Sequence, residues 1–237
     1  MNIDELYDPE FRKFIKSKKP TIIIPVGSIE QHGAHLPIST DSDIVTEIAS
    51  RLAKKCDFIV LPTISYGVSL EHEPLFNLSL EENNLRKTLD DIIVSLNKNH
   101  IKKIIILNGH HGNLKTIDSA GAEIECDRIA YPYRFYISKF SYWHFMKHEF
   151  DHAGFVETSI MLAISDKVKM KKAKKGFLTN GMNKKEIQRI NKLSMQPSGF
   201  PKIAKNGVWG APTGATKKDG QKFLAEIVRN LAKECQS

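Results

Sequence analysis

Cysteine is scarce in this sequence: among its 237 residues only Cys56, Cys126 and Cys235 are cysteines. They are scattered along the chain and form no CxxC pair, so the sequence indicates neither a disulfide framework nor a thiolate zinc site. None of them lies near the histidine-rich segments, which disfavours a cysteine nucleophile. This cysteine usage is typical of a reducing, cytoplasmic setting.

Long apolar runs are also missing. The longest ones fall far short of the roughly 20 residues that a membrane-spanning helix needs. The first residues, MNIDELYDPEFRKF, are mixed in charge and contain no apolar h-region, so we expect no signal peptide and no membrane partner. With 41% hydrophobic and 26% charged residues, the composition is that of an ordinary globular protein. We expect a single α/β domain over residues 1–237.

Several catalytic and nucleotide-binding motifs are absent. Ser28 does not stand in a G-x-S-x-G elbow, which disfavours a serine hydrolase of that type. A phosphate-binding loop, a G-x-G-x-x-G turn after the first predicted strand and the H-E-x-x-H zinc motif are missing too.

The formal net charge is +8, and the densest basic stretch holds six lysines within residues 166–176. That stretch has no interleaved aromatic residues and no Gly-Arg pattern, so we expect a solvated loop or helix end. We therefore predict no nucleic-acid partner, although a basic nucleic-acid-binding protein is the alternative from a different class. The surplus of positive charge could also steer an anionic small substrate towards the protein.

Strand-like and helix-like patterns alternate along the chain. The continuous β-branched run at 21–26 predicts a buried strand, and further strands are expected at 58–64, 102–109 and 128–138, the last with Pro132 at an edge or bulge. Helical spacing of apolar residues predicts helices at 43–55, 81–99, 113–125, 155–165 and 219–235. This order favours a three-layer sandwich with a central, mostly parallel sheet. The Gly/Pro-rich stretch 195–216 is expected to be an ordered functional loop or a surface excursion.

Histidines and carboxylates gather where the predicted strands end. Glu30 and His32 follow the first strand and are two residues apart, so extended backbone points both side chains the same way. Asp41 lies in the loop that follows, His110 comes after the third strand, and Glu157 could come from the start of a later helix. Ligands bind beyond the carboxyl ends of parallel strands, so these segments predict a metal site.

The residue types suggest which metal it is. Two histidines with three carboxylates suit Zn²⁺, Mn²⁺ or Fe²⁺, and five ligands exceed the need of one tetrahedral ion. Asp41 could therefore bridge two ions. His35 and His111 are expected to support the site, and Asp43 to cap the next helix. His72, His100, His144 and His148 are interpreted as surface or core histidines.

Three motifs, GSIEQHGAHLPISTD, NGHHGN and HAGFVETS, together resemble the creatininase (creatinine amidohydrolase) family in order and spacing. NGVWGAPTGATKKDG resembles that family's C-terminal segment, so the likeness runs from about residue 20 to 225. The resemblance implies an α/β fold with a central parallel sheet, a divalent-metal centre, hydrolysis of non-peptide C–N bonds and a homo-oligomer. By position, Glu30, His32, Asp41 and His110 match metal ligands of the family.

One departure from the family pattern concerns the metal centre. Creatininase has an acidic residue two positions after the NGH histidine, where this chain has Gly112. In relatives with glycine there, the Glu of HAGxxETS supplies the carboxylate, which corresponds to Glu157. His152 of the same motif matches a histidine suited to proton transfer. The resemblance therefore implies that His152 and Glu157 are catalytic, with Glu157 also a ligand.

Within the family, the sequences of these motifs are most similar to those of archaeal deformylases of riboflavin and deazaflavin coenzyme biosynthesis. This implies release of formate from a formylamino-pyrimidine ribosyl 5'-monophosphate, with one or two ions of Fe²⁺ or Zn²⁺, or Mn²⁺, per subunit. The resemblance does not place the phosphate contacts, for which Lys202, Lys205 or backbone groups of the 206–216 loop are candidates. The alternative is another amidohydrolase of the family, acting on creatinine or on a peptide-like substrate, and Gly112 argues against creatinine.

Overall fold

The computed structural model describes residues 1–122, 124 and 135–236. Four parallel strands form its sheet in the order β2-β1-β3-β4, so the first and third strands lie in the middle. The strands are β1 (Thr21–Val26), β2 (Ile59–Val60), β3 (Lys103–Asn108) and β4 (Tyr136–Ser141). The register of β1 against β3 runs from Thr21 opposite Lys103 to Val26 opposite Asn108. The predicted mostly parallel sheet is confirmed.

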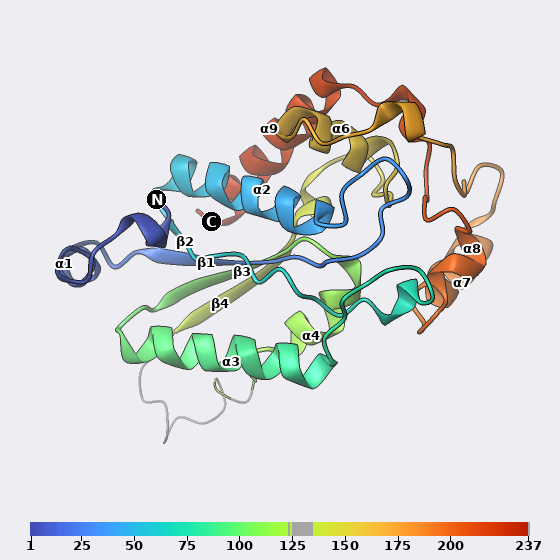
Figure 1. The fold of residues 1–237 in the computed structure, drawn as a ribbon. Helices are drawn as coiled ribbons and strands as arrows, with labels where there is room; N and C mark the ends of the chain where they lie inside the picture. Colours follow the sequence, from blue (N-terminus) through green and yellow to red (C-terminus); the bar gives the residue numbers. More distant parts are fainter. Residues whose placement is uncertain (123, 125–134, 237) are drawn as a thin grey trace.

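Helices cover both faces of this sheet (Figure 1). On one side lie α2 (Thr40–Cys56), α6 (Phe155–Ile164) and α9 (Lys217–Glu234), which share one apolar core. The second core packs α1 (Asp8–Lys18), α3 (Glu82–Lys98) and α4 (Leu114–Ser119) against the sheet. Successive β1 residues alternate between these cores: Ile23 belongs to the first, and Ile22 and Ile24 to the second. Both faces of β1 are therefore apolar, which explains the unbroken run of isoleucines.

Two strands, β2 and β4, have limits in the structure that differ from those predicted from the sequence. Expected over 58–64, β2 is only Ile59–Val60, and the N–H of Leu61 still donates to the carbonyl of Ile23 at 2.9 Å. Pairing with β1 resumes at Ile64, whose N–H donates to the carbonyl of Pro25 at 2.9 Å. The fourth strand was expected at 128–138; β4 continues to Ser141, and Pro132 lies outside the described residues.

Helix α2 begins three residues earlier than the apolar pattern predicts. Its N-cap is Ser39, whose hydroxyl donates to the Asp43 carboxylate at 2.9 Å. The expectation that Asp43 caps the helix is therefore wrong, because Asp43 lies within the first turn. Asp41 also lies in that turn rather than in the preceding loop, and the helix fixes its direction. Helix α4, expected over 113–125, ends at Ser119 because Ala120 is extended and Gly121 has a positive φ of 78°.

The C-terminal part of the chain crosses the carboxyl ends of the strands. Here α7 (Lys184–Ser194) and α8 (Phe200–Ile203) lie beyond the sheet rather than on either face (Figure 1). The 195–216 stretch is thus an ordered segment placed next to the polar strand ends. Within the described ranges, no helix is both long and apolar enough to cross a bilayer.

Candidate metal centre

The segment after β1 is held in a fixed path by backbone hydrogen bonds. The N–H of Glu30 donates to the carbonyl of Ile38 at 2.9 Å, and that of Gln31 to the carbonyl of Phe76 at 2.7 Å. Gly33 then turns the chain with a φ of 61°. Glu30 and His32 are fully buried, so their side chains face the interior and not the solvent.

The five predicted ligands lie together beyond the ends of β1 and β3. Asp41 is central: its Oδ1 is 3.1 Å from His32 Nε2 and its Oδ2 is 3.0 Å from His110 Nδ1. Glu30 Oε2 lies 3.2 Å from His110 Nε2, and Glu157 Oε2 lies 3.5 Å from His32 Nε2. Two donor groups of metal-binding size share Asp41: Glu30, Asp41 and His110 form one, and His32, Asp41 and Glu157 the other.

The donor atoms fit a divalent cation. Three buried carboxylate oxygens, Glu30 Oε1, Asp41 Oδ2 and Glu157 Oε1, make no well-aligned hydrogen bond, although histidine nitrogens lie 3.0 Å from the first two. Leaving such atoms buried without a well-aligned partner is costly, whereas a bound ion would satisfy them. Imidazole nitrogens and carboxylate oxygens are the ligands that Zn²⁺, Mn²⁺ and Fe²⁺ take, so the residues suit the group that the sequence implies.

The charges at the centre shift its pKa values in opposite directions. Burial acts to lower the pKa of His32, but the carboxylates of Asp41, Glu157 and Glu30 together outweigh it and the pKa rises to about 10. Burial likewise opposes the ionisation of Asp41, yet His32 and His110 hold its pKa well below the usual range. Burial raises the pKa of Glu157 to about 8. A cation would have to displace protons from such a centre.

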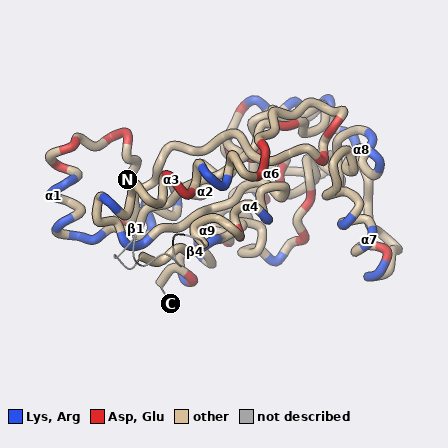
Figure 2. Tube along the Cα trace, turned by 90° about the horizontal axis from the view of Figure 1, so that it is seen from below, with Lys and Arg blue, Asp and Glu red and all other residues tan. Residues whose placement is uncertain are grey.

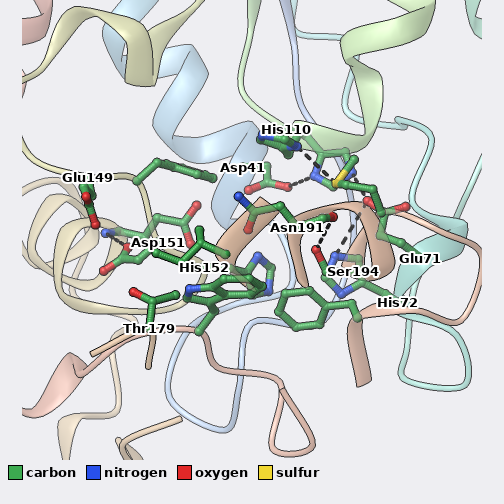
Figure 3. Close-up of a pocket in the computed structure, with 17 residues that line it drawn as sticks. Asp41, Glu71, His72, His110, Glu149, Asp151, His152, Thr179, Asn191 and Ser194 are labelled. Carbon is green, nitrogen blue, oxygen red and sulfur yellow. Dashed lines mark hydrogen bonds and ion pairs between the residues drawn. The ribbon is translucent and has the colours of Figure 1, made fainter. Parts of the chain in front are cut away.

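Glu71 and His72 belong to this centre, although the sequence analysis did not select them. They lie in the short 3-10 helix Leu70–His72 and are almost fully buried. His72 Nε2 is 3.0 Å from Glu30 Oε1. Glu71 Oε1 is 3.2 Å from His110 Nε2 (Figure 3). His72, interpreted from the sequence as a surface or core histidine, is buried and also contacts the predicted ligand Glu30. The sequence feature that could have identified Glu71 and His72 is their position after the second predicted strand.

His152 lies at the inner wall of the pocket and forms a third donor group with Glu30 and His32. A pair of backbone hydrogen bonds with Trp209 holds it, at 3.0 and 2.8 Å. Its Nδ1 is 3.8 Å from Glu30 Oε1, and its ring centroid is 4.2 Å from that of His32. Burial, together with repulsion from His32, keeps the pKa of His152 well below its ordinary value, so the imidazole is neutral.

The loop before α6 orients Glu157. Asp151 accepts the N–H of Val156 at 2.9 Å and that of Glu157 at 3.3 Å, and so caps the first turn of the helix. Glu157 Oε2 accepts the N–H of Ala153 at 2.6 Å. The carboxylate of Glu157 therefore comes from the start of a helix, as the sequence predicts.

The two supporting histidines of the sequence analysis lie at different places. His35 is buried, and its Nε2 is 3.0 Å from the Thr158 hydroxyl on α6, next to Glu157. Burial lowers the pKa of His35 to about 4. His111 lines the pocket and stacks on Trp143 with ring centroids 5.4 Å apart.

A cavity of about 360 Å³ opens onto these residues. Phe150, Phe200, Trp209, Ile187 and Met195 form its apolar walls, and Glu149 and Asp151 add carboxylates (Figure 3). Among the described residues that line it there is no lysine or arginine. Lys202 and Lys205, expected as phosphate contacts, are not part of this lining.

Lysine and arginine residues are spread over the molecule. Figure 2 shows them on α1 at one end and near α7 and α8 at the other, interspersed with acidic residues. The six lysines of 166–176 include exposed side chains on both sides of the short 3-10 helix Met170–Lys172. This agrees with the expected solvated segment.

Comparison with known proteins gives consistent results. The family model of creatininase, described as creatinine amidohydrolase, matches residues 4–235. A mycofactocin precursor peptide peptidase from Mycolicibacterium smegmatis is 29% identical over 229 residues, which cover 92% of this chain and 85% of the relative. A creatinine amidohydrolase from Pseudomonas putida is 28% identical over 188 residues, 68% of this chain and 71% of the relative.

A shorter match involves a different activity. The 2-amino-5-formylamino-6-ribosylaminopyrimidin-4(3H)-one 5'-monophosphate deformylase of Methanosphaera stadtmanae is 35% identical over 109 residues, 44% of this chain and 46% of the relative. Among solved structures, a single-residue mutant of creatininase superposes with a TM-score of 0.85 at 22% identity, over 98% of this chain and 96% of the other. Two further creatininase structures are described as an Mn form and as a Zn–Zn mutant.

Proposed function

This chain belongs to the creatininase family and is a hydrolase, and from that premise we propose that it cleaves the amide C–N bond of a peptide-like substrate at a divalent-metal centre. The observation that carries the proposal is the pair of donor groups joined by Asp41, with oxygens of three buried carboxylates that make no well-aligned hydrogen bond. Glu30, His32, Asp41, His110 and Glu157 are the proposed ligands.

The pocket favours a peptide-like substrate over a phosphorylated one. A phosphate group needs cationic or N–H partners, and the described lining offers carboxylates, aromatic rings, histidines and hydroxyl and amide groups but no lysine or arginine. The match along most of the chain to a peptide peptidase supports the same choice. Deformylation of the pyrimidine formamide remains the second candidate, favoured by the 35% identity over 109 residues.

His152 is proposed to transfer the proton during hydrolysis. When bound, a divalent ion supplies Lewis acidity, which makes water nucleophilic at neutral pH and polarises the amide carbonyl. The neutral imidazole of His152 takes a proton from the attacking water and delivers it to the departing nitrogen. The water oxygen forms the new C–O bond and the C–N bond breaks, which yields a carboxylic acid and an amine. Glu157, whose carboxylate is oriented by the N–H of Ala153, is proposed to act together with His152 in catalysis.

The ion is proposed to be Zn²⁺, Mn²⁺ or Fe²⁺, because imidazole and carboxylate ligands suit all three. Solved creatininases described as Mn and Zn–Zn forms support the first two. A homo-oligomer in a reducing, cytoplasmic setting remains our expectation.

The test combines metal analysis with three assays. The purified protein should contain about one or two divalent ions per chain, and it should release new amino groups from short peptides. Formate release from the pyrimidine formamide and loss of creatinine are measured in parallel. Formate release without peptide cleavage would replace our first candidate by the second.

A variant pair tests the residues. His110→Ala should lose both bound metal and activity, whereas His148→Ala, a change at an exposed histidine outside the pocket, should keep both. Full activity of His110→Ala with its metal content intact would refute the proposed site.

A further inference from the structure

Gly112 leaves a space that a carboxylate from another loop occupies. A Cβ atom at position 112 would lie 2.5 Å from Glu71 Oε1 and 2.5 Å from His110 Nε2, and it would also collide with the carbonyl oxygen of Val68. Such distances are far below van der Waals contact, so no side chain at 112 is compatible with the observed position of Glu71. Position 112 is where creatininase itself has an acidic residue. In this chain the carboxylate near that point is instead Glu71.

The position of Glu71 is fixed by burial and by the hydrogen bonding of the turn that carries it. Its side chain is 6% exposed and comes from the Leu70–His72 turn. The carbonyl of Leu70 in that turn accepts the N–H of Ser198 at 3.0 Å, which ties the turn to the C-terminal segment over the pocket. A buried carboxylate is costly unless a donor or a cation faces it. The group it faces is His110, with Glu71 Oε1 3.2 Å from His110 Nε2.

The two nitrogens of His110 face different partners. Nδ1 lies 3.0 Å from Asp41 Oδ2, one of the carboxylate oxygens that make no well-aligned hydrogen bond. Nε2 lies 2.9 Å from the carbonyl oxygen of Val68 and 3.2 Å from both Glu71 Oε1 and Glu30 Oε2. An imidazole that binds a metal through one nitrogen commonly donates its other N–H to a carbonyl or carboxylate, which fixes the ring and strengthens the ligand.

We propose that Glu71 is a positioning residue of the metal centre, which accepts the His110 Nε2–H together with Val68 so that Nδ1 is presented to the ion beside Asp41. The inference rests on the proposed metal centre and adds to it a residue outside the proposed ligand set. Glu71 supplies negative charge to His110 from the space that Gly112 leaves. It therefore acts on metal affinity through His110.

The test measures the affinity of the full-length protein for Zn²⁺ alone, by competition with a chromophoric chelator. Glu71→Ala removes the acceptor and its charge, and Glu71→Gln keeps the size and one acceptor oxygen but removes the charge. We expect Zn²⁺ affinity to fall roughly 10- to 100-fold in Glu71→Ala and roughly tenfold in Glu71→Gln. Glu73→Gln, which neutralises an exposed carboxylate two residues away, should bind as the unchanged protein does.

Two further measurements separate positioning from packing. With Co²⁺ in place of Zn²⁺, the visible absorption bands should shift in Glu71→Gln, because a less basic His110 changes the ligand field. Circular dichroism of the metal-free variants checks that they fold; if Glu71→Ala does not, Glu71→Gln decides alone. Zn²⁺ affinity within about twofold of the unchanged protein and unshifted Co²⁺ bands in Glu71→Gln would overturn the inference while leaving the proposed function intact. Failure of the unchanged protein to bind any divalent ion would instead refute the proposed function itself.

Discussion

At the scale of single residues, Asp41 has the most connections in the centre. Its two oxygens face two different histidines, His32 and His110, and it is the one residue shared by the two donor groups described above. Glu157 belongs to one of those groups and Glu30 to the other. Mutation of Asp41 should therefore affect both of these donor groups, and mutation of Glu157 or Glu30 only one of them.

We expect Asp41→Ala to abolish the binding of an ion by both of these groups, whereas Glu157→Gln should weaken only the ion held with His32 and Asp41. Removing the shared carboxylate takes a ligand from both groups, and removing Glu157 takes one from a single group. Metal content per chain after dialysis at defined free Zn²⁺ measures the difference. Equal losses in the two variants would contradict the assignment of Asp41 as the bridge.

The thiol of Cys235 gives a prediction that is independent of the metal. Burial raises the pKa of Cys235 to about 11, and a folded-state pKa above the ordinary value keeps the thiol protonated at neutral pH. Because the thiolate is the nucleophile, alkylation by iodoacetamide should accelerate roughly tenfold per pH unit up to about pH 11. Cys56→Ser/Cys126→Ser isolates the signal, and a cysteine-containing peptide is the control. A rate that levels off near pH 8.5 would disprove the prediction.

At the scale of elements, α6 and α9 pack at very close range through a glycine. A Cβ at Gly220 on α9 would collide with the carbonyl of Ser159 on α6. Gly214, which precedes α9, has nothing within 4 Å of its Cβ position. Since α6 carries Glu157, the glycine contact also sets how closely that ligand approaches the sheet.

Gly220→Ala should therefore lower the free energy of unfolding of the metal-free protein by roughly 1–3 kcal/mol, despite the better helix propensity of alanine. Gly214→Ala should leave it within about 0.5 kcal/mol, as expected for a surface change. Urea titrations followed by circular dichroism measure both. Unfolding midpoints that coincide for the two variants would show that α9 can move away without cost.

The elements also show where sequence reasoning succeeds and where it stops. The isoleucine run of β1 and the apolar spacing of α3 and α9 are local signals, so their limits agree with the structure to within two residues. Glu30, His32 and His110 could be found because each follows a strand. Glu71 and His72 sit in a single 3-10 turn after a strand of two residues, and no periodic pattern marks such a turn. Their role depends on contacts with residues far along the chain.

At the scale of the whole molecule, the metal centre would connect, through one set of ligands, elements that otherwise contact one another only by packing. Its donors come from the loop after β1, from α2, from the end of β3 and from α6. An ion that binds the folded chain and not the unfolded one stabilises the fold by mass action.

Zn²⁺ at about 100 times its dissociation constant should therefore add about 2.7 kcal/mol to the free energy of unfolding, with a corresponding rise in Tm. Thermal melts of the dialysed protein over a Zn²⁺ titration measure this effect, and Asp41→Ala serves as the comparison because it lacks the shared ligand. An equal rise in Tm for Asp41→Ala would place the stabilising ion elsewhere.

The spread of the donors along the chain has a consequence for the order of folding. Glu30 follows the first strand to be synthesised, and Glu157 follows the last strand of the sheet. The donor group of His32, Asp41 and Glu157 cannot close until α6 has docked, because Glu157 arrives only with that helix. Capture of an ion by this group is thus a late event in folding, and its rate would report the docking of α6. Metal uptake by this group could therefore serve as a probe for the last steps of folding.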